Sequence, residues 1–261
     1  MRTIWSTLLV YGVALVSVLG LQLVAVTAGL TWRTGAVDLD RDGLSALLIA
    51  VPVSSLALVV IALLAAGRPR RRALRLVPSG VCAREIAVMA AGILALSQAL
   101  ESLVLLLGAG TGPALEWLSR TMASTTPLGL ALAVVVVGLL APIGEELFFR
   151  GYMLTRLRAV WSPGPAILVS AIAFGITHGE WVHGLLAAGI GVYLGLVTER
   201  SGSVVPAIVC HAVNNTASVL LSAWIGSAHG RALNGALLVA MGLVVAWALH
   251  RLRSGWPRAA A

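Results

Sequence analysis

Residues 128–150 read LGLALAVVVVGLLAPIGEELFFR, an apolar run that ends in Glu145, Glu146 and Arg150. A transmembrane helix needs about 20 predominantly apolar residues, and this run supplies them. Each charged group near the middle of a bilayer costs about 2.5–3.5 kcal/mol. Three such groups on one helix are too costly for packing alone. The stretch therefore predicts a membrane-spanning helix whose charged side chains pair with one another or face water.

The composition of the whole chain agrees with a membrane location. Of its 261 residues, 59% are hydrophobic and 11% are charged, whereas a soluble domain is about half apolar and a quarter charged. The net charge is +8, but all 18 basic residues are arginines and lie in short clusters between apolar runs. Such clusters orient membrane proteins. We therefore expect the lipid bilayer as a partner and no nucleic acid.

Seven further apolar runs accompany the quoted one. In chain order the eight runs cover residues 4–30, 44–66, 86–107, 128–149, 165–179, 185–197, 204–225 and 236–252. The fifth and sixth runs are short enough to form one bent hairpin. The sequence thus predicts an all-α fold, a polytopic bundle of about eight transmembrane helices.

The distribution of charge divides the chain and orients it. Residues 1–120 form N-terminal transmembrane helices with an Arg-rich loop, residues 121–226 form a core that carries the polar side chains, and residues 227–261 form a last helix with a basic tail. Arginines concentrate at 68–75, at 156–158 and in the tail. Because basic loops stay on the cytoplasmic side, we predict a multi-pass protein of the cell membrane with both termini in the cytoplasm.

Three of the predicted helices carry polar residues at one depth. Glu145, His178 and His211 each lie eleven to thirteen residues from the predicted cytoplasmic end of their helix. At 1.5 Å per residue, each lies ~16–20 Å below the cytoplasmic surface. The three side chains are therefore expected to meet in one centre.

The spacing within each helix supports a shared centre. Glu146 and Arg150 are four residues apart and can pair on one face. That pairing leaves Glu145, about 100° around the helix, free to face a cavity. His211 and Asn215 are also four residues apart, so they can hold one ligand or one oxyanion between them.

Three motifs follow one another on successive hydrophobic segments. They are Glu145-Glu146-x-x-x-Arg150, Phe174-x-x-x-His178 and His211-x-x-x-Asn215. In this order they resemble the motifs of the CPBP family, which comprises the type II CAAX prenyl endopeptidases and their bacterial relatives, the Abi group. The resemblance covers roughly residues 128–221, and the eight-span layout also fits that family.

The resemblance assigns a role to each motif. It implies that Glu145 is the general base that activates water and that Glu146 and Arg150 support it. The remaining motif residues then complete the catalytic centre; they are His178, His211 and Asn215. The expected activity is hydrolysis of a peptide bond in a hydrophobic or prenylated peptide or protein. CAAX-type C-terminal processing, bacteriocin or small-peptide maturation, and immunity are all compatible with this activity.

Two mechanisms remain open from the sequence. In the first, Glu145 acts without a metal, and His211 and Asn215 donate to the oxyanion. In the second, Zn²⁺ is the cofactor and lowers the pKa of its bound water. Its ligands would come from Glu145, His178, His211 and Asn215. The family is usually described as metallopeptidases, which favours zinc, yet the same residues serve the metal-free mechanism equally well.

Other classes of function are also considered. A proton- or ion-coupled transporter could use the same polar groups, but no repeat relates the two halves of the chain. A non-catalytic peptide-binding immunity protein would have the same sequence features. There is no HExxH motif, and every aspartate lies within residues 38–42, so zincin and aspartyl centres are excluded. Outside the motifs, we expect His183 in a loop and Glu101 as a supporting carboxylate.

Overall fold

The computed structural model describes residues 2–224 and 230–254, and the regular elements in these ranges are all helices. Each of the eight predicted apolar runs overlaps a helix within the described residues, and Ile225 at the end of the seventh run lies outside them. In the described part of the chain, seven helical segments are long and apolar enough to span a membrane. The prediction of an all-α polytopic bundle is therefore confirmed. The seven are α1 (Arg2–Thr34), α2 (Gly43–Ala65), α4 (Ala83–Leu106), the run Pro127–Arg158, α10 (Trp181–Ser201), α11 (Val205–Trp224) and α12 (Arg231–Ser254).

The eighth predicted run is the short helix α9 (Pro163–Ile176), which packs along α10. The chain reverses between them at Gly179, whose φ of +70° lies in the left-handed region that favours glycine. The fifth and sixth predicted runs thus form a hairpin, as the sequence suggests. Two shorter helices lie between spans; they are α3 (Arg70–Ala73) and α5 (Pro113–Ala123).

The central span changes its helical type along its length. It begins where Thr126 accepts a hydrogen bond from the amide of Gly129 and Pro127 takes the first helical position. Two π-helical stretches then flank the segment that carries Glu145 and Glu146. π-Helical turns are rare and occur often at functional sites. The segments are α6 (Pro127–Ala133), η1 (Val134–Leu140), α7 (Ala141–Glu146), η2 (Leu147–Leu154) and α8 (Thr155–Arg158).

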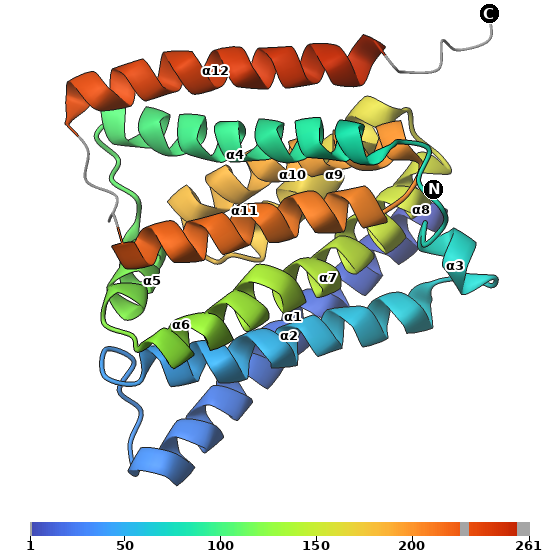
Figure 1. Cartoon of the computed structure of the whole chain (residues 1–261). Helices are drawn as coiled ribbons and strands as arrows, with labels where there is room; N and C mark the ends of the chain where they lie inside the picture. The colour runs from blue at the N-terminus through green and yellow to red at the C-terminus, as the bar shows by residue number, and fades with distance from the viewer. Residues whose placement is uncertain (1, 225–229, 255–261) are drawn as a thin grey trace, which may run out of the picture.

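Helix pairs enclose this central span. Figure 1 shows α12 lying along α4 on one side of the bundle and α1 crossing α2 on the other, with the central span and α9–α11 between them. The approach of α7 to α2 depends on Gly144, because a Cβ there would lie 2.8 Å from the backbone of Ser55. Large apolar side chains on α1 and α12 remain exposed, as expected for surfaces that face lipid.

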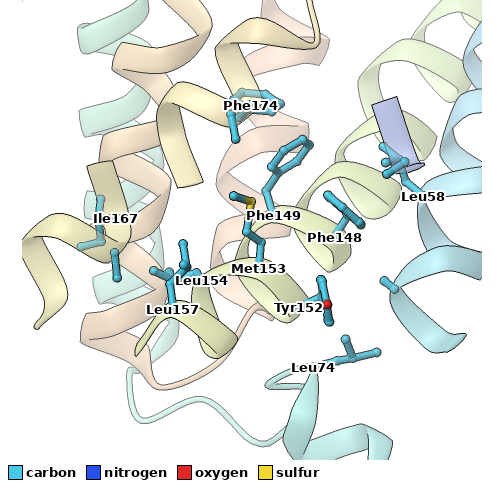
Figure 2. Packing of buried hydrophobic residues seen from close by; sticks show 14 of the residues in the cluster. Leu58, Leu74, Phe148, Phe149, Tyr152, Met153, Leu154, Leu157, Ile167 and Phe174 are labelled. Atoms are coloured by element: carbon cyan, nitrogen blue, oxygen red, sulfur yellow. The ribbon is translucent and has the colours of Figure 1, made fainter. Parts of the chain in front are cut away.

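Among the described residues, the cluster with the most buried apolar side chains includes much of η2 (Figure 2). Every residue of η2 is buried, so this segment lies at the centre of the molecule rather than on its surface. The rings of Phe148 and Phe149 meet edge to face, with centroids 5.0 Å apart. The ring of Phe149 also meets that of Phe174, from α9, at 5.2 Å. This aromatic packing holds α9 against the span that carries the two glutamates.

The helices α3, α8 and the end of α12, which carry arginine clusters, lie toward the same side of the bundle in Figure 1. Arg258 of the predicted basic tail lies outside the described residues. Glu199 near the end of α10 pairs there with Arg75 at 2.6 Å and with Arg158 at 2.8 Å. The backbone amide of Val204 donates to the carbonyl of Arg75 at 3.0 Å. Part of the Arg-rich segment is therefore anchored to the bundle.

Candidate active site

The floor of the site is a buried ion pair between Glu146 and Arg150. Both side chains are fully buried, and Nη1 of Arg150 donates to Oε1 of Glu146 at 2.6 Å. Nη2 of Arg150 donates to the carbonyl of Gly191 on α10 at 3.0 Å. The guanidinium carbon also lies 4.7 Å from the ring centroid of Phe174, a cation–π contact. Arg150 thus joins the central span to α9 and α10.

Glycine at position 191 makes this junction possible. A Cβ at Gly191 would lie 2.9 Å from Nη2 of Arg150 and 3.1 Å from Ala171. A larger residue would therefore displace either the guanidinium group or α9.

His211 on α11 connects the ion pair to Glu145. Its Nδ1 lies 2.9 Å from Oε1 of Glu146. Because the Arg150-paired carboxylate only accepts hydrogen bonds, Nδ1 is the donor. The other ring nitrogen, Nε2, lies 3.7 Å from Oε2 of Glu145. Glu146 therefore fixes the orientation of His211 and directs Nε2 toward Glu145.

A cavity of about 850 Å³ opens beside Glu145, within the size range of small-molecule sites. Glu145 keeps 25% of its side chain exposed, whereas Glu146 has none. The two adjacent glutamates therefore occupy different environments, as their spacing predicts. All three motifs contribute polar residues to the cavity wall, and these are Glu145, His178, His211 and Asn215.

His178 follows the end of α9. Its Nδ1 lies 3.0 Å from the carbonyl oxygen of Phe174, so Nδ1 donates and a neutral ring leaves Nε2 as an acceptor. The ring also packs edge to face on Phe174, with centroids 4.8 Å apart. Phe174 thus orients His178 through both its backbone and its ring.

The expectation that His183 is a loop residue is wrong. His183 lies in the first turn of α10, lines the cavity, and packs against His178 with ring centroids 4.4 Å apart. Glu180 begins this helix, because its side chain accepts hydrogen bonds from the amides of Val182 and His183 at 2.8 and 3.0 Å. An acidic residue three positions before His183 is the sequence signal that could have placed it on a helix.

Asn215 extends the site toward the central span. Its Nδ2 donates to the carbonyl oxygen of Val137 in η1 at 3.3 Å. Asn214 donates in turn to Oδ1 of Asn215 at 3.5 Å and also lines the cavity. The sequence motif includes only Asn215, so Asn214 is a cavity residue that the motif spacing misses.

The cavity extends beyond the three motifs to helices of the N-terminal half. The supporting carboxylate expected at Glu101 lies on its wall. Most of the other lining residues are apolar, so the cavity combines a polar end with hydrophobic walls. Representative wall residues are Val18 of α1, Leu47 of α2, Leu94 of α4, and Leu115 and Leu118 of α5.

The predicted zinc ligands do not assemble into a recognisable metal site. Among the residues that the structure describes, no group of three or more His, Cys, Asp or Glu side chains is placed to hold a metal ion. Nδ1 of His178 and Nδ1 of His211 are bonded to protein acceptors, which leaves Nε2 as the ring nitrogen that could bind a metal. A catalytic zinc site normally has three protein ligands, and the described side chains are not placed to supply three. Zinc stays a prediction, and no step below passes through it.

Comparison with known proteins identifies the part of the chain that carries the site. Residues 127–217 match the family model described as type II CAAX prenyl endopeptidase Rce1-like. The match begins at the first residue of α6, ends within α11, and contains all three motifs. No curated protein and no solved structure matches the chain significantly. Over this helical core, the chain is similar to the type II CAAX prenyl endopeptidases of the Rce1-like family.

Proposed function

We propose that this protein is an intramembrane endopeptidase in which Glu145 is the general base. The observation that carries the proposal is that the two adjacent glutamates lie in different environments. Glu146 is buried and paired with Arg150, whereas Glu145 faces a cavity that His178 and His211 also line. One carboxylate thus holds the site together, and the other is available to a water molecule.

The proposed reaction begins with the attacking water. Glu145 accepts one of its protons, and Nε2 of His178 accepts a hydrogen bond from its other O–H. The water oxygen then forms a bond to the carbonyl carbon of the peptide. When the carbon–nitrogen bond breaks, Glu145 returns the proton to the leaving amine. A positioned general base typically contributes 10²–10⁴-fold to the rate.

The tetrahedral intermediate carries an oxyanion that needs hydrogen-bond donors. Asn215 uses one amide hydrogen for the carbonyl of Val137, and its second is available. His211 presents only Nε2 to the cavity, because Nδ1 is bonded to Glu146. In its protonated form, His211 donates from Nε2. Each such donor is worth about 10²–10³-fold when it is aimed at the oxyanion.

The hydrophobic cavity walls support a hydrophobic or prenylated substrate. A CAAX-type protein would place its lipid between the apolar side chains of α1, α2 and α5. A small hydrophobic peptide, as in bacteriocin maturation, would use the same walls without a prenyl group. The two substrate classes differ in whether the isoprenoid contributes to binding.

The proposal is tested with purified wild-type protein in mixed micelles. A farnesylated CAAX peptide and the same peptide without its farnesyl group are offered in parallel, each with and without prior removal of metal by a chelator. We expect cleavage of the farnesylated peptide, and we expect it to persist after chelation. Activity that is lost with the chelator and restored by Zn²⁺ would replace the metal-free mechanism. If neither this peptide nor any hydrophobic peptide is cleaved, a non-catalytic peptide-binding role replaces the protease.

A further inference from the structure

A second cavity lies between α4, α10 and α12. Its volume is about 430 Å³, and none of its lining residues also lines the active-site cavity. The first turns of α4, the end of α10 and the last turns of α12 form its walls. These residues are Cys82, Arg84, Glu85, Val88, Met89, Arg200, Trp247, Arg251 and Leu252.

The charged side of this cavity is lined by three arginines and one glutamate among the described residues. Nη2 of Arg200 donates to Oε1 of Glu85 at 2.8 Å, and the side chain of Arg200 is only 12% exposed. Oε2 of Glu85 accepts from the backbone amide of Cys82 at 2.9 Å. Arg200 therefore pairs with Glu85, which is the one acidic side chain among the described lining residues. The exposed residues Arg84 and Arg251 add two positive charges at the same place.

The opposite side of the cavity is apolar. Met89 and Leu252 are buried there, and the large ring of Trp247 is 44% exposed. Trp247 precedes Arg251 by four residues on α12, so both side chains lie on the same face of the helix. A charged rim beside an apolar surface matches the chemistry of a phospholipid, with its headgroup joined to acyl chains.

The depth of the cavity also matches a headgroup. Arg84 is the second residue of α4, and Arg251 is near the end of α12. Figure 1 shows both helix ends at the same side of the bundle as α3 and α8. Tryptophan is enriched where membrane meets water, and basic pockets between transmembrane helices bind anionic headgroups. This placement is the same whichever leaflet that end of the bundle occupies.

We propose that this cavity binds an anionic phospholipid. Arg84 and Arg251 contact the phosphate, and an acyl chain lies along Trp247 and Val88. The bound lipid would join α12 to α4, the helix against which α12 mainly packs. A ligand that binds only the folded state raises the stability of that state. The stability of the packing of α12 on α4 would therefore depend on the lipid composition of the membrane, independently of peptidase activity.

The test uses delipidated full-length protein in nonionic detergent. Phosphatidylglycerol, phosphatidylcholine and inorganic phosphate are titrated separately, with binding followed by native mass spectrometry and by thermal unfolding. We expect saturable binding of phosphatidylglycerol, with a rise in Tm that phosphatidylcholine does not give. Arg84→Gln/Arg251→Gln should weaken this binding about 10-fold or more, since each arginine near an anionic lipid contributes about a factor of five.

The matched control is Arg71→Gln/Arg72→Gln, which removes the same charge from exposed positions on α3, outside the cavity lining. This control should leave phosphatidylglycerol binding unchanged. An equal loss of phosphatidylglycerol affinity in both double variants would show that the lipid is attracted by the overall positive charge of the protein and not by this cavity. If the double variant does not fold, the single variants Arg84→Gln and Arg251→Gln are measured instead. Each should lose less affinity for phosphatidylglycerol than the double variant. The proposal is overturned if phosphatidylcholine binds as well as phosphatidylglycerol, or if inorganic phosphate alone reproduces the effect.

Discussion

At the scale of single residues, two adjacent glutamates differ because their neighbours differ. The spacing of Glu146 and Arg150 predicts their pairing, since both lie on one helix. The hydrogen bond from His211 to Glu146 joins residues 65 positions apart on different helices. Spacing within each helix predicts that the two residues lie at a similar depth, but it does not predict that they bond to each other. His183 was missed for the same reason, because its contact with His178 depends on how the α9–α10 hairpin closes.

Glu146→Gln tests the buried pair. The substitution leaves the guanidinium of Arg150 buried without its carboxylate, and a single neutral amide oxygen remains to accept hydrogen bonds from Arg150 and His211. Breaking a buried pair by removing one partner costs about 3–5 kcal/mol. We expect a clearly lower unfolding midpoint in detergent than for wild type. A midpoint within about 1 °C of wild type would show that this pair does not support the fold.

His183→Ala tests whether the ring of His183 positions His178. Removing a ring that packs 4.4 Å from His178 should allow that side chain to shift, and small misplacements at an active site are costly. We expect peptide cleavage, measured as kcat/KM, to fall about 10-fold. His183→Phe should restore most of the rate, because phenylalanine supplies an aromatic ring that has no titratable nitrogen. If His183→Phe is as impaired as His183→Ala, His183 acts through its nitrogen atoms instead.

At the scale of helices, apolar runs of sufficient length predict where the elements lie. The helical type within each element depends on packing between helices, which cannot be predicted from the sequence alone. The π-helical stretches η1 and η2 on either side of Glu145 have no signature in the apolar run 128–149. The short helix α9 packs along α10, its partner in the hairpin.

Gly144→Ala tests the contact between α7 and α2. A Cβ at this position would lie 2.8 Å from the Ser55 backbone, so the helices must separate. Such overpacking costs about 1–3 kcal/mol. We expect a lower unfolding midpoint and reduced cleavage, because Glu145 follows directly. The control is Gly12→Ala on α1, where nothing lies within 4 Å of the added Cβ and helix propensity favours alanine. Equal effects of the two substitutions would contradict the close approach.

At the scale of the whole molecule, the arginine distribution predicts one polar end, and the fold gathers these residues there. Arg75 and Arg158, distant in sequence, both pair with Glu199. The common depth of the motif residues predicts a single centre, and residues from each of the three motifs line one cavity. The walls contributed by α1, α2 and α5 could not be predicted, because apolar spans carry no signal of which neighbour they face.

The orientation of the bundle is tested with reporter fusions. Because the arginine clusters gather at one end, fusions after Arg72 and after Arg158 should both report the cytoplasm, while a fusion after Asp40 should report the outside. An external signal after Arg72 together with an internal signal after Asp40 would invert the molecule in the membrane.

The central claim is that Glu145 is the base of an intramembrane peptidase. The most direct measurement is the rate at which Glu145→Gln protein cleaves a farnesylated CAAX peptide, compared with wild type in the same micelles. Glutamine keeps the size of the side chain and removes the base. Cleavage should therefore fall by at least ~10²-fold while the unfolding midpoint stays near that of wild type. Cleavage by Glu145→Gln at the wild-type rate would contradict the claim.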